Sequence, residues 1–297
     1  MRFAPYLVLL AAHFLWAGNW IVARAVRDEI PPAIATMTRQ LVVLAVLAPF
    51  AFASLRTKLK DFGARDWRML VALAFFGGGL HLSLQWLGLH YTTATSATLY
   101  LSISPIFILL LARPLLGEAI SAPQWLGVLI SLPGVVLIAT RGDPSGFSFN
   151  PGDLLALAAM VMWAAYTVFL RLRRDTLDTV EFLVMLCLFG LLFMGPWVLW
   201  EILNQANLRP TPAGALAVLY SAIGSMLLAY TGWNYAVKRL GAARVGVTMH
   251  LTTAIAVLLA ALFLGEYPGW YHGAGIALIL AGVALSSFRA SSAASSR

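Results

Sequence analysis

The chain has 297 residues, of which 61% are hydrophobic and only 11% are charged. Its mean hydropathy of +0.84 lies above the range of water-soluble globular proteins, so the composition excludes that class and predicts an integral membrane protein. The formal net charge is +8, but the basic residues are spread over many connections, which does not indicate binding to nucleic acid. The single cysteine, Cys187, excludes a disulfide framework and a cysteine metal cluster.

The hydrophobic segments are long enough to cross a bilayer as helices. A crossing takes about 20 mostly apolar residues, and a helix satisfies its backbone N–H and C=O groups within the segment. Breaks at charged residues and at Pro/Gly clusters give ten predicted spans. They cover residues 5–25, 32–54, 68–89, 94–115, 122–140, 152–170, 181–201, 213–237, 242–264 and 270–288. The connections are short, so successive helices are expected to be antiparallel neighbours, and residues 290–297 are expected to form a disordered tail.

Lys and Arg residues are unequally distributed between the two sides of the predicted membrane. One side holds most of them, including Arg2, residues 56–68, residues 171–174, Lys238 and Arg289. The other side holds Arg24, Arg27, Arg141 and Arg209. Because positively charged loops are retained in the cytoplasm, the first side and both chain termini are predicted to be cytoplasmic.

The sequence contains an internal repeat. Residues 91–141 and residues 239–289 align without a gap at an offset of 148, which predicts two related halves, residues 1–145 and residues 146–289. In this alignment Gly117-Glu118 matches Gly265-Glu266, and each Glu is followed by glycines at nine and sixteen residues. Five spans per half is an odd number, so the second half enters the membrane in the opposite orientation. The sequence therefore predicts an all-α membrane protein with a five-plus-five inverted repeat, an architecture common among alternating-access transporters.

These motifs resemble the EamA repeat of the drug/metabolite transporter superfamily. The resemblance rests on the paired Gly-Glu loops after the fourth helix of each half, on His90-Tyr91-Thr92-Thr93-Ala94 and on Pro133-Gly134-Val135. The aromatic density is most similar to that of the YddG-type amino-acid exporters. The resemblance implies a ten-helix fold with cytoplasmic termini, a central cavity lined by both halves, and export of amino acids, related metabolites or drugs.

Aromatic and polar side chains share faces of several predicted helices. Trp16, Asn19 and Trp20 are spaced i, i+3 and i+4, which places an amide between two indoles on one face. Further candidates for substrate binding are His81 and Gln85, Tyr100, Trp163 and Tyr166, Tyr230, Trp233 and Asn234, and His250. Polar side chains inside a membrane are costly unless they face protein or a wet cavity, so this grouping indicates a solute path. Plain aromatic packing and interhelical hydrogen bonds are the alternative interpretation.

Charged residues within the spans are few. Arg39 lies inside the second span, and Arg244 is expected near the outer end of the ninth, where it could meet a substrate carboxylate or extend to the lipid headgroups. No Asp or Glu lies near the centre of a span, so proton coupling would have to use His13, His81 or His250. Glu118 and Glu266 are expected to brace their own loops. The glycines 77–79 could release backbone carbonyls toward a solute or serve close helix packing.

The sequence has no phosphate-binding loop, HExxH motif or GxSxG motif, so neither an enzyme nor a cofactor or metal site is predicted. We expect a secondary transporter of the cytoplasmic membrane that exports small amphipathic metabolites, most of all amino acids, including aromatic ones. Its partners would be the solute and the lipid bilayer, and the sequence does not define the oligomeric state. The alternatives are an exporter of nucleosides or organic cations, a polytopic enzyme acting on lipid, and a structural membrane protein.

Overall fold

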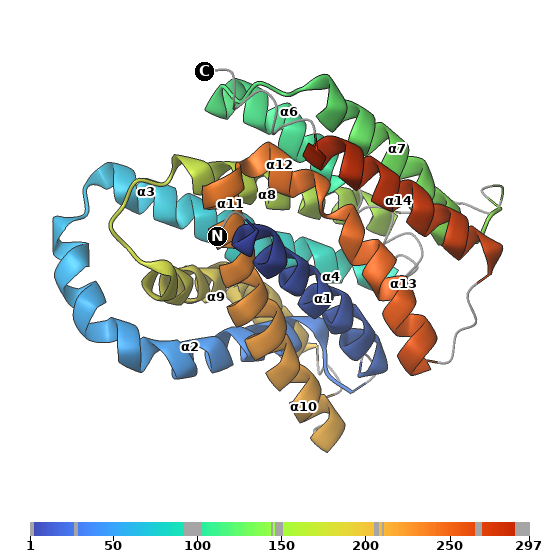
Figure 1. The fold of residues 1–297 in the computed structure, drawn as a ribbon. Coiled ribbons are helices and arrows are strands. Elements are labelled where there is room, and N and C mark those ends of the chain that lie inside the picture. Colours follow the sequence, from blue (N-terminus) through green and yellow to red (C-terminus); the bar gives the residue numbers. More distant parts are fainter. Residues whose placement is uncertain are drawn as a thin grey trace.

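The structure is a computed structural model, and all its described regular elements are helices (Figure 1). The described residues are 3–26, 29–91, 103–143, 145, 151–204, 208–209, 211–264 and 269–288. Tyr100, Glu266 and the expected tail at residues 290–297 lie outside them. The side chain of Trp20 is also outside the description, although its backbone belongs to a helix.

The helix boundaries follow most of the predicted spans closely. The first part of the predicted span 94–115 lies outside the described residues, and the predicted span 242–264 is divided between two helices. In the first half the helices are α1 (Ala4–Ala25), α2 (Pro32–Lys58), η1 (Leu59–Asp61), α3 (Ala64–Leu73), η2 (Ala74–Leu80), α4 (His81–Tyr91), α6 (Ser104–Leu116) and α7 (Ala122–Ala139). In the second half they are α8 (Pro151–Leu172), α9 (Thr179–Leu203), α10 (Pro212–Tyr220), η4 (Ser221–Ala229), α11 (Tyr230–Leu240), α12 (Ala242–Val247), α13 (His250–Leu264) and α14 (Trp270–Phe288). The segments α3–η2–α4 and α10–η4–α11 each coincide with one predicted span.

Local sequence explains where these helices begin and end. Proline occupies the first turn of α1, α2, α6, α7 and α10, where its missing N–H costs no hydrogen bond. The first turn of α9 has reciprocal bonds between Asp178 and Glu181, which satisfy backbone N–H groups that the helix leaves free. Gly117 ends α6 with a positive φ of 64°, a conformation that glycine adopts without a steric penalty.

Six stretches of the described residues are long and apolar enough to cross a membrane. They are Ala4–Ala23, Pro32–Asp61, Ala64–Gln85, Pro151–Leu172, Thr179–Leu203 and Pro212–Leu240. Shorter apolar helices cover Ser104–Leu116, Ala122–Ile138 and Trp270–Leu285. The protein is thus an all-helical integral membrane protein, while the arrangement of ten spans with cytoplasmic termini stays a prediction.

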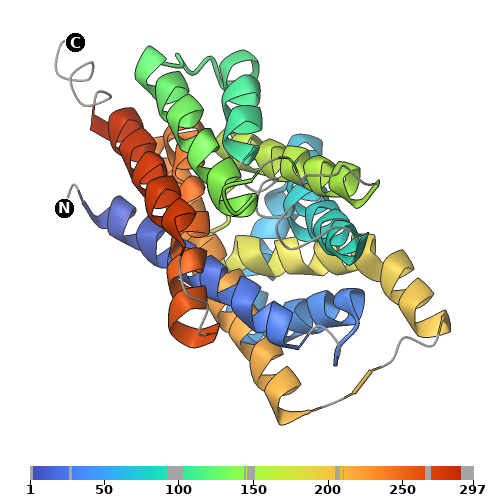
Figure 2. The same cartoon turned by 90° about the vertical axis from the view of Figure 1, so that its right-hand side faces the viewer.

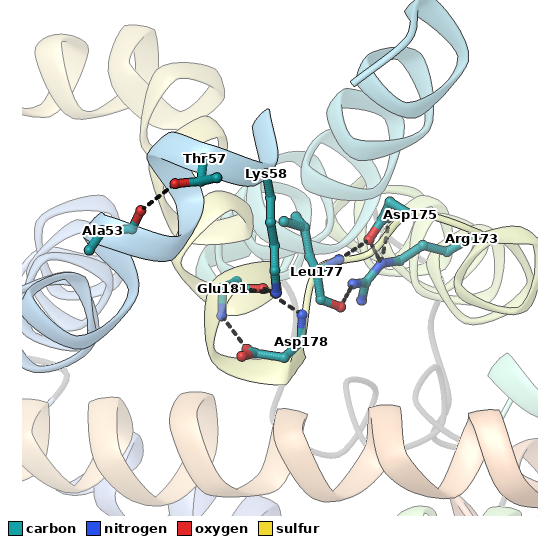
Figure 3. A network of polar contacts seen from close by, with 8 residues as sticks. All are labelled: Ala53, Thr57, Lys58, Arg173, Asp175, Leu177, Asp178 and Glu181. Carbon is teal, nitrogen blue, oxygen red and sulfur yellow. Dashed lines mark hydrogen bonds and ion pairs between the residues drawn. The ribbon is translucent and has the colours of Figure 1, made fainter. Parts of the chain in front are cut away.

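The internal repeat makes α2 equivalent to α9 and α7 equivalent to α14. The two helices of each pair pack against each other and run antiparallel. The end of α2 meets the start of α9, where Lys58 Nζ lies 2.7 Å from the buried carboxylate of Glu181 (Figure 3). At the other end of the pair, Glu201 near the end of α9 accepts hydrogen bonds from the N–H groups of Ala33 and Ile34 at the start of α2. The two helices are therefore tied by a carboxylate at each end.

The second antiparallel pair is α7 and α14, which lie side by side along their length (Figures 1 and 2). The repeat glycines allow this contact: a Cβ added to Gly275 would lie 2.6 Å from the carbonyl oxygen of Gly134. A Cβ added to Gly282 would likewise overlap the carbonyl oxygen of Gly127. Small residues let membrane helices approach until their backbones touch, so the glycines that reveal the repeat also form its interface.

Each half carries a π-helical segment at the equivalent place. The segments η2 and η4 begin at Ala74 and Ser221, which are 147 residues apart in the sequence. A π-helix is rare and its i→i+5 pattern often marks a functional site. Both segments lie in the middle of their spans.

Candidate functional site

Four aromatic rings from both halves meet in the centre of the protein. Trp16 of α1, Trp163 of α8, and Tyr230 and Trp233 of α11 form this aromatic cluster. The ring centroid of Trp16 lies 5.4 Å from that of Trp163 and 5.3 Å from that of Trp233. The ring of Tyr230 is 5.4 Å from Trp163. The crossed and tilted ring planes are the arrangement that aromatic quadrupoles favour.

A cavity of about 70 Å³ lies beside the aromatic cluster. We call it the central cavity. Of the residues that the sequence nominated for substrate binding, it is lined by Trp16, Asn19, His81, Gln85, Trp163 and Tyr230. They come from α1, α4, α8 and α11, so helices far apart in the sequence supply one wall of rings and several amide, imidazole and hydroxyl groups.

The other described candidates lie behind this wall. Tyr166 donates a hydrogen bond of 2.8 Å to Asn234 Oδ1, and both side chains are buried. Trp233 and His250 are also fully buried. None of these four residues lines the central cavity in the described conformation. Tyr166 packs against the cluster, with its ring centroid 5.3 Å from that of Trp163.

Carbonyl oxygens of the two π-helical segments accept hydrogen bonds from residues in and around the cavity wall. Tyr230 Oη donates to the carbonyl of Gly77 at 3.1 Å, and Gln40 Nε2 donates to that of Gly78 at 2.8 Å. Trp16 Nε1 donates to the carbonyl of Ser225 at 3.1 Å. The glycine run also serves close packing, because a Cβ on Gly77 would overlap the ring of Tyr166. These carbonyls therefore hold the site together rather than facing a solute.

Two histidines near the cavity have hydroxyl or carbonyl partners. The ring nitrogens of His13 lie 2.8 Å from Thr252 Oγ1 and 2.9 Å from Thr248 Oγ1. His81 Nδ1 lies 2.9 Å from the carbonyl oxygen of Ala159, to which it donates. Neutral imidazoles satisfy all of these bonds, and none of the partners among the described residues is a carboxylate.

A second cavity of about 30 Å³ adjoins the first. Asn19 and Arg39 line both cavities. The rest of its lining comes from the end of α1, the start of α2 and the α10–η4 segment, including Val26, Ala35 and Ser221. The second cavity thus lies toward the α1–α2 connection, which the distribution of positive charge assigns to the outer side.

Comparison with known proteins identifies the family. The sequence model of the EamA-like transporter family matches residues 3–140 and 150–288. The chain belongs to the EamA-like transporter family. It is therefore a membrane transporter, and the resemblance read from the Gly-Glu loops is confirmed.

Individual relatives agree with this assignment. An uncharacterized transporter of Archaeoglobus fulgidus is 30% identical over 293 residues, which cover 96% of this chain and 98% of that protein. A probable terminal-alkyne amino-acid exporter of Streptantibioticus cattleyicolor is 30% identical over 227 residues, 75% of this chain and 73% of that protein. One solved crystal structure, 24% identical, matches the fold with a TM-score of 0.80 over 97% of both chains.

Sequence reasoning did not assign two features of this EamA-like transporter to the site. The sequence shows Arg39 as a charge within a span, but it does not indicate that Arg39 lies at the junction of the two cavities. Ser225 also lines the central cavity and is not among the residues that the sequence indicates. A buried charge in a membrane helix is itself a signal of function, and it was available for Arg39.

The expectation that Glu118 braces its own loop is wrong. Its carboxylate accepts hydrogen bonds from the N–H groups of Ala242 and Ala243, at 3.4 and 3.2 Å, and lies 3.7 Å from Arg171 Nε. All three partners belong to the second half. Negative charge is favourable at a helix N-terminus and beside arginine, so Glu118 links the two halves of the transporter.

Arg244 lies on α12, whose first residues bind Glu118, so it belongs to the same end of the protein as Glu118. The charge distribution predicts that this end faces the cytoplasm, and the expectation that Arg244 lies near the outer end of its span does not fit that prediction.

Proposed function

We propose that this transporter exports small amphipathic metabolites, with amino acids, including aromatic ones, as the first candidates. The observation that carries the proposal is the central cavity, where rings and polar groups from both halves share one wall. Aromatic faces would hold the apolar body of a solute, and Asn19, Gln85 and Thr252 offer hydrogen bonds to its polar groups. The named activity of the Streptantibioticus relative points the same way.

We further propose that transport proceeds by alternating access between inverted halves, residues 1–145 and 146–289, in the cytoplasmic membrane. The antiparallel pairs α2–α9 and α7–α14 support the inversion, because equivalent helices run in opposite directions. Pockets for drug-sized ligands span roughly 300–1,000 Å³, so a cavity of about 70 Å³ must widen to admit a solute. Rocking of one half against the other would provide that change.

The proposal predicts a tryptophan-dependent exchange. Protein reconstituted in vesicles preloaded with phenylalanine should take up radiolabelled phenylalanine in saturable counterflow. Trp16→Ala and Trp163→Ala should raise the KM roughly tenfold, because each removes from the cavity wall a ring that would pack on the solute, and an aromatic pair is worth about 0.5–1.5 kcal/mol. The measurement is the initial rate of uptake over a range of internal and external concentrations.

A matched control is Trp200→Ala, since Trp200 of α9 is exposed on the outside of the helix bundle. It should leave the counterflow unchanged. Uptake that never saturates, or that is equally sensitive to all three substitutions in folded protein, would contradict a binding role for the aromatic cluster.

A further inference from the structure

We propose that Arg39 binds a carboxylate group of the transported solute. The inference rests on the proposed function, in that the central cavity is taken as the place where solute is held. It goes further by specifying the chemistry of the solute, an acidic group joined to an apolar or aromatic body. Arg39 and Asn19 belong to both cavities, so the acidic group would lie at their junction.

Arg39 is buried with few partners. Its side chain sits on α2 at 4% exposure. One terminal nitrogen donates a long hydrogen bond of 3.3 Å to Ser221 Oγ, and Nε has no hydrogen-bond partner among the described residues. The described part of the chain also places no carboxylate within ion-pair distance of it. The guanidinium therefore has an unpaired donor among the described residues, and the side chain that carries it lines both cavities.

Two acidic residues at the same end of the protein, Glu29 and Glu201, bind other groups. Glu201 binds the N–H groups of Ala33 and Ile34 at the start of α2. Glu29 accepts a hydrogen bond from the Thr211 hydroxyl. Neither carboxylate pairs with Arg39 in the described conformation, although both lie toward the same end of the protein as the second cavity.

An arginine in this position favours an anion. Guanidinium stays protonated in proteins, and burying its charge without a counter-charge is costly. Its planar fork of N–H donors matches the two oxygens of a carboxylate, which can accept two parallel hydrogen bonds. A carboxylate of the solute would supply the missing counter-charge while the rings of Trp16, Trp163 and Tyr230 hold the apolar part.

The same charge argues against a cationic solute. The described lining of the central cavity contains Arg39 and no Asp or Glu. An organic cation would face like charge at the junction without a carboxylate to offset it. Of the solutes that the aromatic wall alone would admit, the structure therefore favours acids and zwitterions over organic cations.

The test uses two probes of similar size that differ in charge, 3-phenylpropionate and phenethylamine. Each is titrated into the purified full-length protein in detergent, and binding is read from the shift in melting temperature and from tryptophan fluorescence. The wild type should bind 3-phenylpropionate in preference to phenethylamine. Arg39→Gln should raise the Kd of 3-phenylpropionate about tenfold or more, the effect expected for loss of charged hydrogen bonds.

Two further variants separate binding from folding. Arg39→Lys keeps the charge without the fork and should recover part of the affinity. Arg68→Gln removes an exposed arginine whose side chain, among the described residues, donates to the carbonyl of Ala64 in its own helix, and it should bind like the wild type. Equal binding of 3-phenylpropionate by wild type and a folded Arg39→Gln, or stronger binding of phenethylamine by the wild type, would overturn the proposal.

The outcome is distinguishable from failure of the proposed function. Arg39-dependent binding in detergent together with vesicles that show no counterflow would uphold the carboxylate site and reject transport of such solutes. Saturable counterflow that Arg39→Gln leaves unchanged would uphold transport and reject the carboxylate site. The carboxylate site and the transport function are therefore tested by separate measurements.

Discussion

Behind the aromatic cluster, a hydrogen bond between two buried side chains joins α8 to α11. Tyr166 Oη donates to Asn234 Oδ1 at 2.8 Å in a site closed to solvent. The ring of Tyr166 packs at the same time against Gly77, where there is no room for a side chain. Hydroxyl and ring thus fix three helices of both halves relative to one another.

Removing this hydroxyl should lower stability by a small amount. Tyr166→Phe keeps the ring but leaves Asn234 Oδ1 without its donor, and interhelical hydrogen bonds in membrane proteins average about 0.6 kcal/mol with a maximum near 1.7. The free energy of unfolding in SDS measures the change. Tyr6→Phe is the control, because no hydrogen bond of the Tyr6 hydroxyl exists among the described residues. A loss no larger than that of the control would show that the bond contributes nothing.

Spacing along a helix predicted which residues share a face, but not what that face meets. Trp16 and Asn19 were placed together correctly, and both line the central cavity. Tyr230 and Asn234 were grouped by the same rule, yet Tyr230 lines the cavity whereas Asn234 bonds to Tyr166. Periodicity fixes angles within one helix, while the rotation of that helix depends on contacts with distant segments.

At the scale of single helices, the sequence predicts where many helices begin and end, but it does not predict the π-helical segments inside them. Proline and glycine act locally, so they mark boundaries such as the start of α10 and the end of α6. The π-helical segments η2 and η4 have no comparable local signal. Gly77-Gly78-Gly79 hinted at irregularity in the first half, but η4 has only Gly224 within its sequence. The side chains that bind their carbonyls come from other helices.

The α7–α14 contact gives a direct test of the role of the repeat glycines. Gly275→Ala would bring a Cβ to 2.6 Å from the carbonyl of Gly134, so the helices must separate and stability should fall. Gly273→Ala on the same helix meets open space, and alanine favours a helix by about 1 kcal/mol over glycine. Thermal unfolding of purified protein should rank Gly275→Ala below wild type and Gly273→Ala at or above it. Equal melting temperatures for the two variants would contradict the tight contact.

At the scale of the whole molecule, the sequence predicts that the second half is inverted relative to the first. An odd number of spans per half implied inversion before any contact was known, and the antiparallel pairs α2–α9 and α7–α14 agree with it. The side of the membrane was inferred from Lys and Arg alone. The links between the halves at Glu118 and Glu201 could not be inferred, since capping partners far apart in the sequence are set by the assembled fold.

The inverted arrangement predicts that equivalent connections lie on opposite sides of the membrane. In a Cys187→Ala background, Arg65→Cys at the start of α3 and Asn204→Cys at the end of α9 introduce thiols at exposed positions. A membrane-impermeant maleimide should label Asn204→Cys in intact bacterial cells and Arg65→Cys only after lysis. Labelling of both thiols from one side of the membrane would rule out the inversion.

The contact of Glu118 with Arg171 and the first turn of α12 has a kinetic consequence. Glu118 belongs to the first half and its partners belong to the second, so any motion that separates the halves at that end must break the contact. In the proposed alternating-access cycle the contact would contribute to the free-energy difference between the two end states, and a shift of about 1.4 kcal/mol would change their populations tenfold. A substitution at Glu118 would therefore shift the turnover and the apparent affinity without altering any residue that lines the central cavity.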